Sequence, residues 1–422
     1  MSVSVTSGFS KKVVAAWGSF DYAMASFSGI MVTFVFPIYF RNVIVTNGHG
    51  DAYWSATVAS SMLLVALLTP LLGAMADVLN NKKVYLAIFT AVTVATTALL
   101  YFMQPGMVLI AALLFILANA GFEGGIVFYD AFLPEITTPQ TYGRVSGFGF
   151  ACGYIGSLAI LIINQPFFET TPKTTFLVVA AFITVFSLPL FLIVPEKRHP
   201  IRINFRALVR RGFGQLRTTI GHIREYEHVT KFLLAYFLYN DAILTVIAFS
   251  GVYANATLHF GMTELALWFA MIQIVAVIGS LIFGRIADAS GPKLAISITL
   301  LIWILVVTLA YFTTTKTAFY FVGAIAGLAL GSSQSCSRSL MALLTPPEHT
   351  AEFFGFYDGF CGKASAVIGP ITFGILSELF GSQRPAILAL GSFFIMGLLL
   401  LRRVKEQKAV AEGQSFEGAT VG

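Results

Sequence analysis

The sequence has little charge. Of its 422 residues only 11% are Asp, Glu, Lys or Arg, whereas 57% are hydrophobic, and the mean hydropathy is +0.82. An ordinary soluble domain carries about 25% charged residues. The shortage excludes such a domain, and we expect the lipid bilayer to be the solvent of this chain.

Cysteine and histidine are also scarce. Cys152, Cys336 and Cys361 all fall in apolar runs, without the spacing of metal ligands or of a disulfide framework. The six histidines fall in loops or at predicted helix ends, and the GKAS string at 362–365 lacks the upstream glycine of a phosphate loop. These absences give no reason to expect a cofactor, a metal site, an enzyme or a nucleotide-driven pump.

Long apolar runs dominate what remains. A helix needs about 20 mainly apolar residues to cross the hydrocarbon layer. Twelve runs meet this length, allowing a few residues of uncertainty at each end, and they predict an all-α integral membrane protein with twelve transmembrane helices: 13–40, 52–75, 84–103, 107–132, 146–167, 175–194, 232–257, 264–286, 294–312, 318–344, 356–380 and 385–401.

The basic residues are distributed unequally between the two sides of this arrangement. Of the 26 Lys and Arg residues, twenty fall on the side of the N-terminus and two inside predicted helices. Only four fall on the opposite side, namely Arg41, Lys173, Lys316 and Arg384. Because cytoplasmic loops are enriched in Lys and Arg, both termini are predicted to be cytoplasmic. The net charge of +6 follows from this bias and does not indicate nucleic-acid binding.

The two halves of the chain repeat one another. The segment LLGAMADVLNNK at 71–82 recurs as IFGRIADASGPK at 282–293, so that Asp77 matches Asp288 and Lys82 matches Lys293 at a separation of half the chain length. Each copy falls on the turn between the second and third helices of its half. This predicts two six-helix halves in a parallel repeat, with a substrate held near the midplane between them.

The repeated segments resemble the signature loop of the major facilitator superfamily, which has a Gly, three residues, an Asp and a basic cluster. Stretches spread over both halves, among them FYDAFLPEI at 128–136 and FFGFYDGFCGKASAVIGP at 353–370, resemble the vacuole-effluxer-like branch of that superfamily. The resemblance implies the major facilitator fold and, from the fungal vacuolar member, export of amino acids.

The repeated loops are expected to act in gating. Asp77 and Asp288 suit a helix terminus or an ion pair, while Lys82 and Lys293 hold the turns at the cytoplasmic face. Arg is common in the signature at the positions of Val78 and Ala289, so an ion pair here would need another base.

Seven ionisable residues fall inside predicted helices, where an unpaired charge costs about 2.5 to 3.5 kcal/mol: Asp21, Glu123, Asp130, Asp241, Arg338, Asp358 and Lys363. Glu123 and Asp130 are seven residues apart and share a helix face. For Asp130, a role in substrate binding and a role in gating or capping are equally compatible with its place near a cytoplasmic helix end, and the same holds for Arg338. We interpret Asp358 and Lys363 as an ion pair within one helix.

The sharpest hypothesis concerns Arg338, Glu123 and Asp241, with Asp21 and Asp130 as further candidates for substrate binding or proton coupling. One base facing two acids would suit a zwitterion, or an anion moved with a proton. A buried carboxylate would carry that proton, since histidine is missing from the helices.

The stretch 195–230 separates the first half, 1–194, from the second, 231–402, and a polar tail, predicted to be disordered, follows at 403–422. Within the stretch, apolar residues fall on one helical face opposite a row of arginines, which predicts an amphipathic helix on the cytoplasmic leaflet. Gly212 and Gly214 weaken the prediction of one continuous helix. The apolar face holds Ile201, Phe205, Leu208 and Leu216, and the basic face Arg202, Arg206, Arg210 and Arg217.

The most specific functional expectation is a monomeric secondary transporter of a small polar metabolite in the inner (plasma) membrane of a bacterium. Its partners would be the lipid bilayer, the small-molecule substrate and protons. Two alternatives stay open. Organic cation or drug efflux would suit the excess of acids over bases in the helices, and a transport-inactive receptor or scaffold would use the same cavity for signalling.

Overall fold

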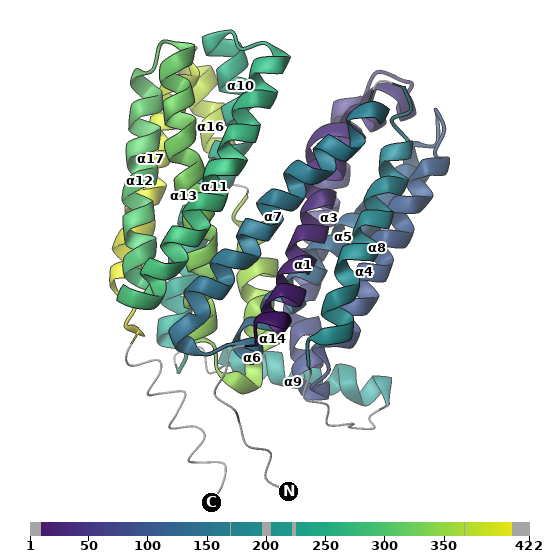
Figure 1. The fold of residues 1–422 in the computed structure, drawn as a ribbon, viewed down its shortest axis with the longest axis vertical. Helices are drawn as coiled ribbons and strands as arrows, with labels where there is room; N and C mark the ends of the chain where they lie inside the picture. Colours follow the sequence, from purple (N-terminus) through teal and green to yellow (C-terminus); the bar gives the residue numbers. More distant parts are fainter. Residues whose placement is uncertain (1–9, 169, 196–203, 222–224, 367, 407–422) are drawn as a thin grey trace, which may run out of the picture.

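The computed structural model describes residues 10–168, 170–195, 204–221, 225–366 and 368–406. Its helices form two bundles, drawn in purple to blue and in green to yellow in Figure 1. The first bundle contains α1 (Lys11–Phe27), which continues through η1 (Ser28–Phe34), α2 (Val35–Tyr39) and η2 (Phe40–Ile44), followed by α3 (Gly50–Leu79), α4 (Lys82–Leu99), η3 (Leu100–Phe102), α5 (Val108–Asp130), α6 (Leu133–Ile136), η4 (Pro139–Thr141), α7 (Tyr142–Asn164), η5 (Gln165–Phe167) and α8 (Thr174–Ile193).

The second bundle repeats this plan. It contains α10 (Glu227–Leu258), α11 (Met262–Ser290), α12 (Pro292–Phe312) and α13 (Lys316–Leu344), then the short η6 (Pro347–His349) and a broken helix made of α14 (Thr350–Phe354), η7 (Gly355–Cys361), α15 (Gly362–Ala364) and α16 (Ile368–Leu379), and finally α17 (Gln383–Arg402). Each bundle therefore supplies six spans.

The predicted fold of twelve transmembrane helices in two halves is confirmed. Within the described residues, eleven helical stretches are long and apolar enough to cross a membrane. The twelfth span is α13, in which the polar run SSQSCSRS at 332–339 lowers the hydropathy. Large apolar side chains remain exposed on the outside of the bundles, Leu109, Leu192 and Leu379 among them, as the surface that contacts lipid requires.

Both repeated loops contain a residue with positive φ directly after the helix. Asn80, after α3, has a φ of 50° and a ψ of 44°, and Gly291, after α11, has a φ of 90° and a ψ of 139°. These two residues are as far apart in the chain as the two aspartates that precede them. A residue with positive φ is a common way to end a helix, and it allows the next helix to start at once.

The two bundles meet at one end and lean apart at the other (Figure 1). We call the end where α3 meets α14 and α7 meets α11 the closed end; α1 begins there, and α17 ends there. Glycines permit the contact, since a Cβ atom at Gly73 would lie 2.3 Å from the carbonyl oxygen of Ala351, and one at Gly143 would lie 2.3 Å from that of Gly284. Small residues allow such close approach of helix backbones in a membrane.

The segment between the halves contains one continuous helix, α9 (Phe205–Gly221), which runs beneath the first bundle at the closed end (Figure 1). Gly212 and Gly214, which weakened the prediction of one continuous helix, do not interrupt α9. Gly212 faces the bundle, where a Cβ atom would lie 2.5 Å from Met75 Cγ, so the missing side chain serves packing of α9 on α3. Leu208 and Thr219 are buried on the same face, whereas the arginines at 206, 210, 211 and 217 are exposed. Ile201, Arg202 and the tail from 407 onward lie outside the described residues.

Candidate functional site

A polar cavity of about 350 Å³ lies between the halves. It is lined by residues of both bundles, from α1, α5 and α7 on one side and from α10, α11, α13, η7 and α15 on the other. Six charged residues line it: Asp21, Glu123, Asp130, Arg338, Asp358 and Lys363. The structure therefore brings together six of the seven ionisable residues predicted inside helices, and it leaves out Asp241.

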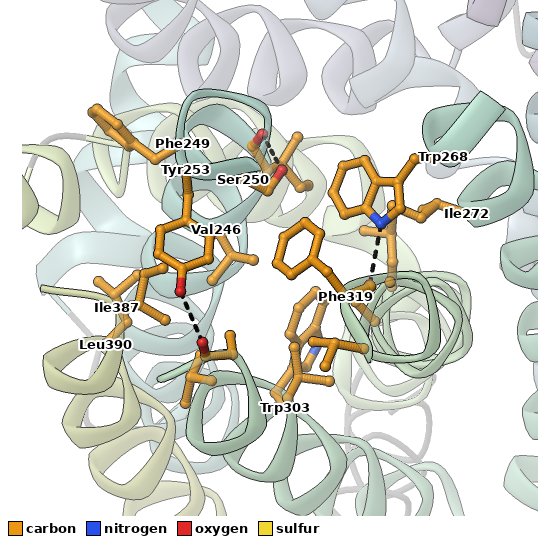
Figure 2. A pocket seen from close by; sticks show the side chains of 18 of the residues that line it. Val246, Phe249, Ser250, Tyr253, Trp268, Ile272, Trp303, Phe319, Ile387 and Leu390 are labelled. Atoms are coloured by element: carbon orange, nitrogen blue, oxygen red, sulfur yellow. Dashed lines mark hydrogen bonds between the residues drawn. The ribbon is translucent and has the colours of Figure 1, made fainter. Parts of the chain in front are cut away.

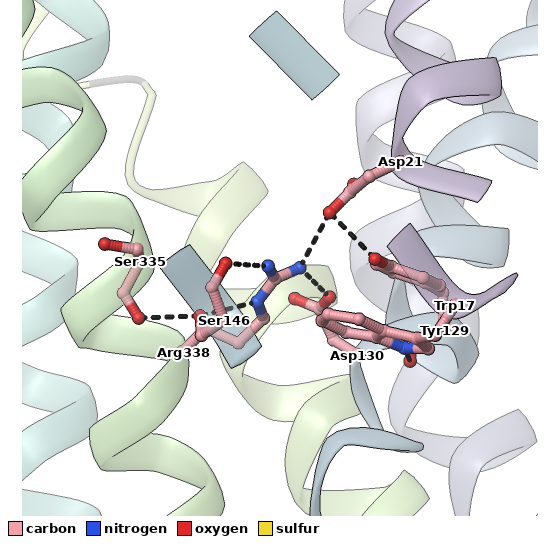
Figure 3. A network of polar contacts seen from close by, with 7 residues as sticks. All are labelled: Trp17, Asp21, Tyr129, Asp130, Ser146, Ser335 and Arg338. Carbon is pink, nitrogen blue, oxygen red and sulfur yellow. Dashed lines mark hydrogen bonds and ion pairs between the residues drawn. The ribbon is translucent and has the colours of Figure 1, made fainter. Parts of the chain in front are cut away.

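Arg338 joins the halves at one wall of this cavity (Figure 3). Its Nη1 atom lies 2.6 Å from Asp130 Oδ1 and 3.2 Å from Asp21 Oδ2. Its Nε and Nη2 atoms donate to the side-chain and backbone oxygens of Ser146, at 2.9 and 2.8 Å. The Arg338 side chain is only 1% exposed. Because each of its nitrogens already has an acceptor, Arg338 is a link between the halves rather than a free docking point for substrate.

Aromatic rings enclose the guanidinium group. Its Cζ atom lies 4.8 Å from the ring centre of Trp17 and 4.1 Å from that of Phe150. Tyr129 completes the shell, since its hydroxyl donates to Asp21 Oδ2 at 2.9 Å and its carbonyl accepts from Trp17 Nε1 at 3.1 Å. The attraction between a cation and the face of an aromatic ring is strongest where water is excluded.

Glu123 and Lys363 form a second ion pair across the halves. Lys363 Nζ, on α15, lies 2.5 Å from Glu123 Oε2, on α5. The predicted pair within one helix, Asp358 with Lys363, is therefore wrong. The two residues are five apart, which is not the spacing of three or four that brings side chains together on a helix. Instead α5 packs beside this segment and offers a carboxylate to each residue.

Asp130 and Asp358 are in direct contact. Their carboxyl groups lie close enough to interact directly, so that α5 and η7 meet through two acids. Asp130 is almost fully buried, and the Oδ2 atom of Asp358 is buried without a partner. A hydrogen bond between two carboxyl groups requires one of them to carry a proton.

Asp241 has a different place. Its Oδ2 atom accepts the backbone N–H of Gly369 at 2.7 Å, at the start of α16, where the broken helix resumes. A carboxylate is stabilised by the positive end of a helix dipole. The hypothesis that Arg338, Glu123 and Asp241 form one site is therefore wrong: Arg338 is bonded to Asp21 and Asp130, Glu123 to Lys363, and Asp241 caps a helix.

At the closed end Asp77 bridges the halves. Its Oδ1 atom accepts the N–H of Ala351 at 3.0 Å, and its Oδ2 atom accepts the N–H of Glu352 at 2.8 Å. Both donors belong to the first turn of α14. Glu352 is itself fully buried, and its Oε2 atom accepts from Gln215 Nε2 of α9 at 2.7 Å, so the helix between the halves is joined to the same contact.

Asp288 makes the equivalent bridge in the opposite sense. Its Oδ1 atom accepts the N–H of Gly143 at 2.7 Å, and its Oδ2 atom accepts the N–H of Arg144 at 3.2 Å, both in the first turn of α7. The Arg144 side chain adds an ion pair at 2.6 Å. Arg144 is thus the base that pairs with Asp288, while Asp77 uses backbone donors.

The two lysines of the repeated loops each stay within their own half. Lys82 Nζ lies 2.5 Å from Glu135 Oε1 in α6. Lys293 Nζ donates to the carbonyl oxygens of Arg402 and Val404, at 2.9 and 2.6 Å, where α17 ends. Its backbone N–H donates to Glu406, a carboxyl group whose pKa is raised by burial. At the closed end, Lys82 thus holds α6 and Lys293 holds the end of α17.

A smaller cavity, of about 70 Å³, lies within the second bundle (Figure 2). Its walls are almost entirely aliphatic and aromatic, with Trp268, Trp303 and Phe319 among them. The polar atoms of two of its residues are turned to backbone carbonyls, since Tyr253 Oη donates to Ala310 and Trp268 Nε1 to Phe319. A polar metabolite would find few partners there, so the cavity between the halves is the candidate substrate site.

Comparison with known proteins identifies the family. Residues 49–414 match the family described as vacuole effluxer Atg22 like. The chain is also 31% identical over 417 residues to the uncharacterized MFS-type transporter YxiO of Bacillus subtilis (strain 168), a match that covers 94% of this chain and 96% of that protein. The chain belongs to the Atg22-like branch of the major facilitator superfamily. It is therefore a membrane transporter and not an enzyme.

Solved structures agree with this Atg22-like assignment at the level of the fold. The human organic anion transporter MFSD10 (TETRAN) superposes with a TM-score of 0.75 at 14% identity, over 93% of this chain and 99% of that one. The major facilitator transporter FucP in its outward conformation gives 0.73 at 12% identity, over 93% and 98%.

Several site residues of this Atg22-like chain are uncharged and were missed by the search for intramembrane charges. They include Ser146 and Tyr129 on the Arg338 network and Gly149, where a Cβ atom would lie 2.7 Å from Arg338 Nη2. The nearest signal in the sequence was the pair Gly143 and Gly147, four residues apart, which lie on the face of α7 that approaches the other half.

Proposed function

We propose that the protein is a secondary active transporter that moves a small zwitterionic metabolite, such as an amino acid, by alternating access with protons as the coupling ion. The observation that carries this proposal is the ion pair between Glu123 and Lys363. Its members belong to opposite halves, line the cavity and stay partly accessible, with side-chain exposures of 11% and 22%.

A zwitterion has the charges to replace each partner of this pair. Its carboxylate suits the Lys363 ammonium group, and its own ammonium suits Glu123, so binding would exchange one ion pair for two without leaving a buried charge alone. Neutral donors and acceptors line the same cavity, among them Asn240, Gln273 and Gln334 on the second half. They suit the polar parts of a small metabolite.

The cycle would alternate between two arrangements of the halves. Asp77 and Asp288 hold the closed end together in the arrangement described here. The excess of basic residues on this side supports a cytoplasmic location for the closed end and for both termini, in the plasma membrane of a bacterium. On this orientation the structure is outward-facing, and release of the contacts of Asp77 and Asp288 would open the cavity to the cytoplasm.

A binding screen tests the proposal. Purified protein is heated with libraries of amino acids, organic anions and organic cations, because a ligand that binds only the folded state raises the apparent stability. Zwitterions are expected to stabilise the wild type, and Lys363→Gln and Glu123→Gln are each expected to weaken this response by at least tenfold in ligand concentration. Lys316→Gln, which removes a surface ion pair with Glu264, is the matched control and should respond like the wild type.

The compound that stabilises the protein is then measured by counterflow in proteoliposomes. Stabilisation without counterflow would favour the receptor reading over transport. One observation favours a second cargo: the cavity is lined by four acids and two bases, which suits an organic cation. In that case cations alone would stabilise the wild type, and Lys363→Gln would strengthen their binding instead of weakening it.

A further inference from the structure

The charges of the cavity do not balance. Its bases are Arg338 and Lys363, and the ion pairs of the described residues assign Arg338 to Asp21 and Asp130 and Lys363 to Glu123. Asp358 makes no ion pair within that part of the chain. It instead contacts another acid, Asp130, across the boundary between the halves.

A proton held between these two carboxyl groups is expected on Asp358. Asp130 Oδ1 already accepts from Arg338 Nη1 at 2.6 Å, and a guanidinium N–H favours the ionised form of the carboxylate that receives it. Asp358 has no ion pair among the described residues, so it is the partner that would carry the proton and donate its O–H to Asp130. Without that proton, two negative carboxylates would face each other at close range, which is strongly unfavourable.

We propose that Asp358 is the proton-carrying residue of the transport cycle and that its proton is what allows the closed end to close. This proposal rests on the proposed function, from which it takes the orientation of the protein in the membrane and proton coupling. Asp358 lines the cavity, so in this arrangement it takes a proton from the side to which the cavity opens. When the halves separate at the closed end, Asp130 and Asp358 part, and Asp358 releases the proton to the cytoplasmic side.

The surroundings of Asp358 leave no other group to neutralise it. Arg338 of α13 is engaged by Asp21 of α1 and Asp130 of α5, and Lys363 of α15 is engaged by Glu123. The remaining titratable groups that face the Asp130–Asp358 pair are phenols: Tyr129 of α5, Tyr236 of α10, and Tyr357 beside Asp358. None of them supplies a positive charge, so an ionised Asp358 would repel Asp130 whenever the halves closed.

The backbone at Asp358 is specialised. It lies in η7, a π-helical segment, and such segments occur often at functional sites. Thr69 of α3 packs closely on this segment, since a Cβ atom at Gly359 would overlap the Thr69 side chain. The Thr69 Oγ1 atom lies 2.9 Å from the carbonyl oxygen of Val65 in its own helix and 3.3 Å from that of Gly355. The segment η7 therefore holds Asp358 against α5. It packs on α3, and α3 continues to the closed end.

Two measurements that need no substrate test the proposal. In the first, spin labels on Gln140→Cys and Glu348→Cys, exposed positions of opposite halves at the closed end, report its opening in a protein whose native cysteines are replaced. The wild type should show the short distance in acidic buffer and a growing long-distance population as pH rises. Asp358→Asn keeps an N–H donor for Asp130 without the titration, so it should show the short distance at every pH. Lys316→Gln, which removes a surface ion pair with Glu264, should keep the pH response.

The second measurement is the infrared C=O stretch of protonated carboxyl groups. A band that titrates with the opening should be present in the wild type and in Lys316→Gln and absent from Asp358→Asn. It should also disappear in Asp130→Asn, where the new amide donates to Asp358 and lets it ionise. Wild-type pH dependence in Asp358→Asn, or a band that persists in it, would refute the proposal. Neither readout depends on whether a zwitterion binds. The test of Asp358 therefore stays valid even if the binding screen finds no zwitterionic substrate.

Discussion

Asp77 and Asp288 perform the same contact from opposite halves of the molecule. Each ends the second span of its half and accepts the backbone N–H groups of the second and third residues of a helix in the other half, Ala351 and Glu352 for Asp77, and Gly143 and Arg144 for Asp288. Helix N-termini attract carboxylates because their N–H groups are unpaired and carry the positive end of the dipole. The sequence repeat is thus also a repeat of function.

The first prediction concerns this pair. Asp77→Asn and Asp288→Asn should each shift the population toward opening of the closed end, and Asp288→Asn should shift it further because it also loses the ion pair with Arg144. A hydrogen bond to a charged group contributes about 1.5 to 3 kcal/mol, so a shift of roughly tenfold is expected. The labels at 140 and 348 measure it, and transport should slow.

The control for this prediction is Glu227→Gln, which removes a surface ion pair with Lys231 within one helix and should leave the distances unchanged. Affinity for the transported compound should stay within about twofold of wild type in both Asp variants, since neither acid lines the cavity. Loss of binding in a folded Asp77→Asn protein would contradict an assignment to gating.

The second prediction is the orientation. Single cysteines at Asn204, ahead of α9, and at Asn47, on the opposite side, are both exposed and are introduced into a protein without native cysteines. In intact cells an impermeant thiol reagent should label position 47 and leave position 204 unlabelled until the cells are broken. The reverse pattern would invert the assignment of the closed end to the cytoplasm.

The spans were predictable because the bilayer leaves few options. Every backbone polar group in lipid must be bonded within its own helix, so a long apolar run has one structure. Even α13, with Arg338 in a polar segment, was recognised from its length and flanks. The repeat then predicted that the loops at Asp77 and Asp288 are equivalent. The continuity of α9 was missed because a glycine that costs helix propensity was not recognised as a packing contact with Met75.

The pairing of charges was not predictable in the same way. Seven ionisable residues in the helices permit many pairings, and sequence distance favours partners on one helix, as in the pair Asp358 and Lys363. The real partners lie on opposite halves, where only the packing of α5 against η7 and α15 decides them. Asp241 showed the same limit, because its partner is a backbone N–H that no residue type reveals.

The third prediction concerns two glycines of α7, Gly149 and Gly153. It tests which of them is needed because a side chain would not fit. A Cβ atom at position 149 would lie 2.7 Å from both Arg338 Nη2 and Trp17 Cζ3, whereas one at position 153 would meet nothing closer than 3.6 Å. Gly149→Ala should therefore lower the thermal unfolding midpoint. Gly153→Ala should leave it unchanged or raise it, since alanine is favoured in helices by about 1 kcal/mol. Equal midpoints for the two variants would contradict the close contact at Gly149.

The last prediction concerns the link between Arg338 and Asp130. Removing one member of a buried ion pair costs about 3 to 5 kcal/mol because the other charge stays buried and unpaired. Arg338→Gln should destabilise the protein strongly, because it leaves both acids without their base. Asp130→Asn should cost less, because Arg338 keeps its ion pair with Asp21. The double variant should be less destabilised than the two single effects combined. Arg338→Lys should not rescue stability, because an ammonium group cannot reach Asp21, Asp130 and both oxygens of Ser146 as the planar guanidinium does. Unfolding of the four variants in detergent gives the coupling. Additive effects, or a Lys variant as stable as wild type, would show that this pair does not hold the halves together.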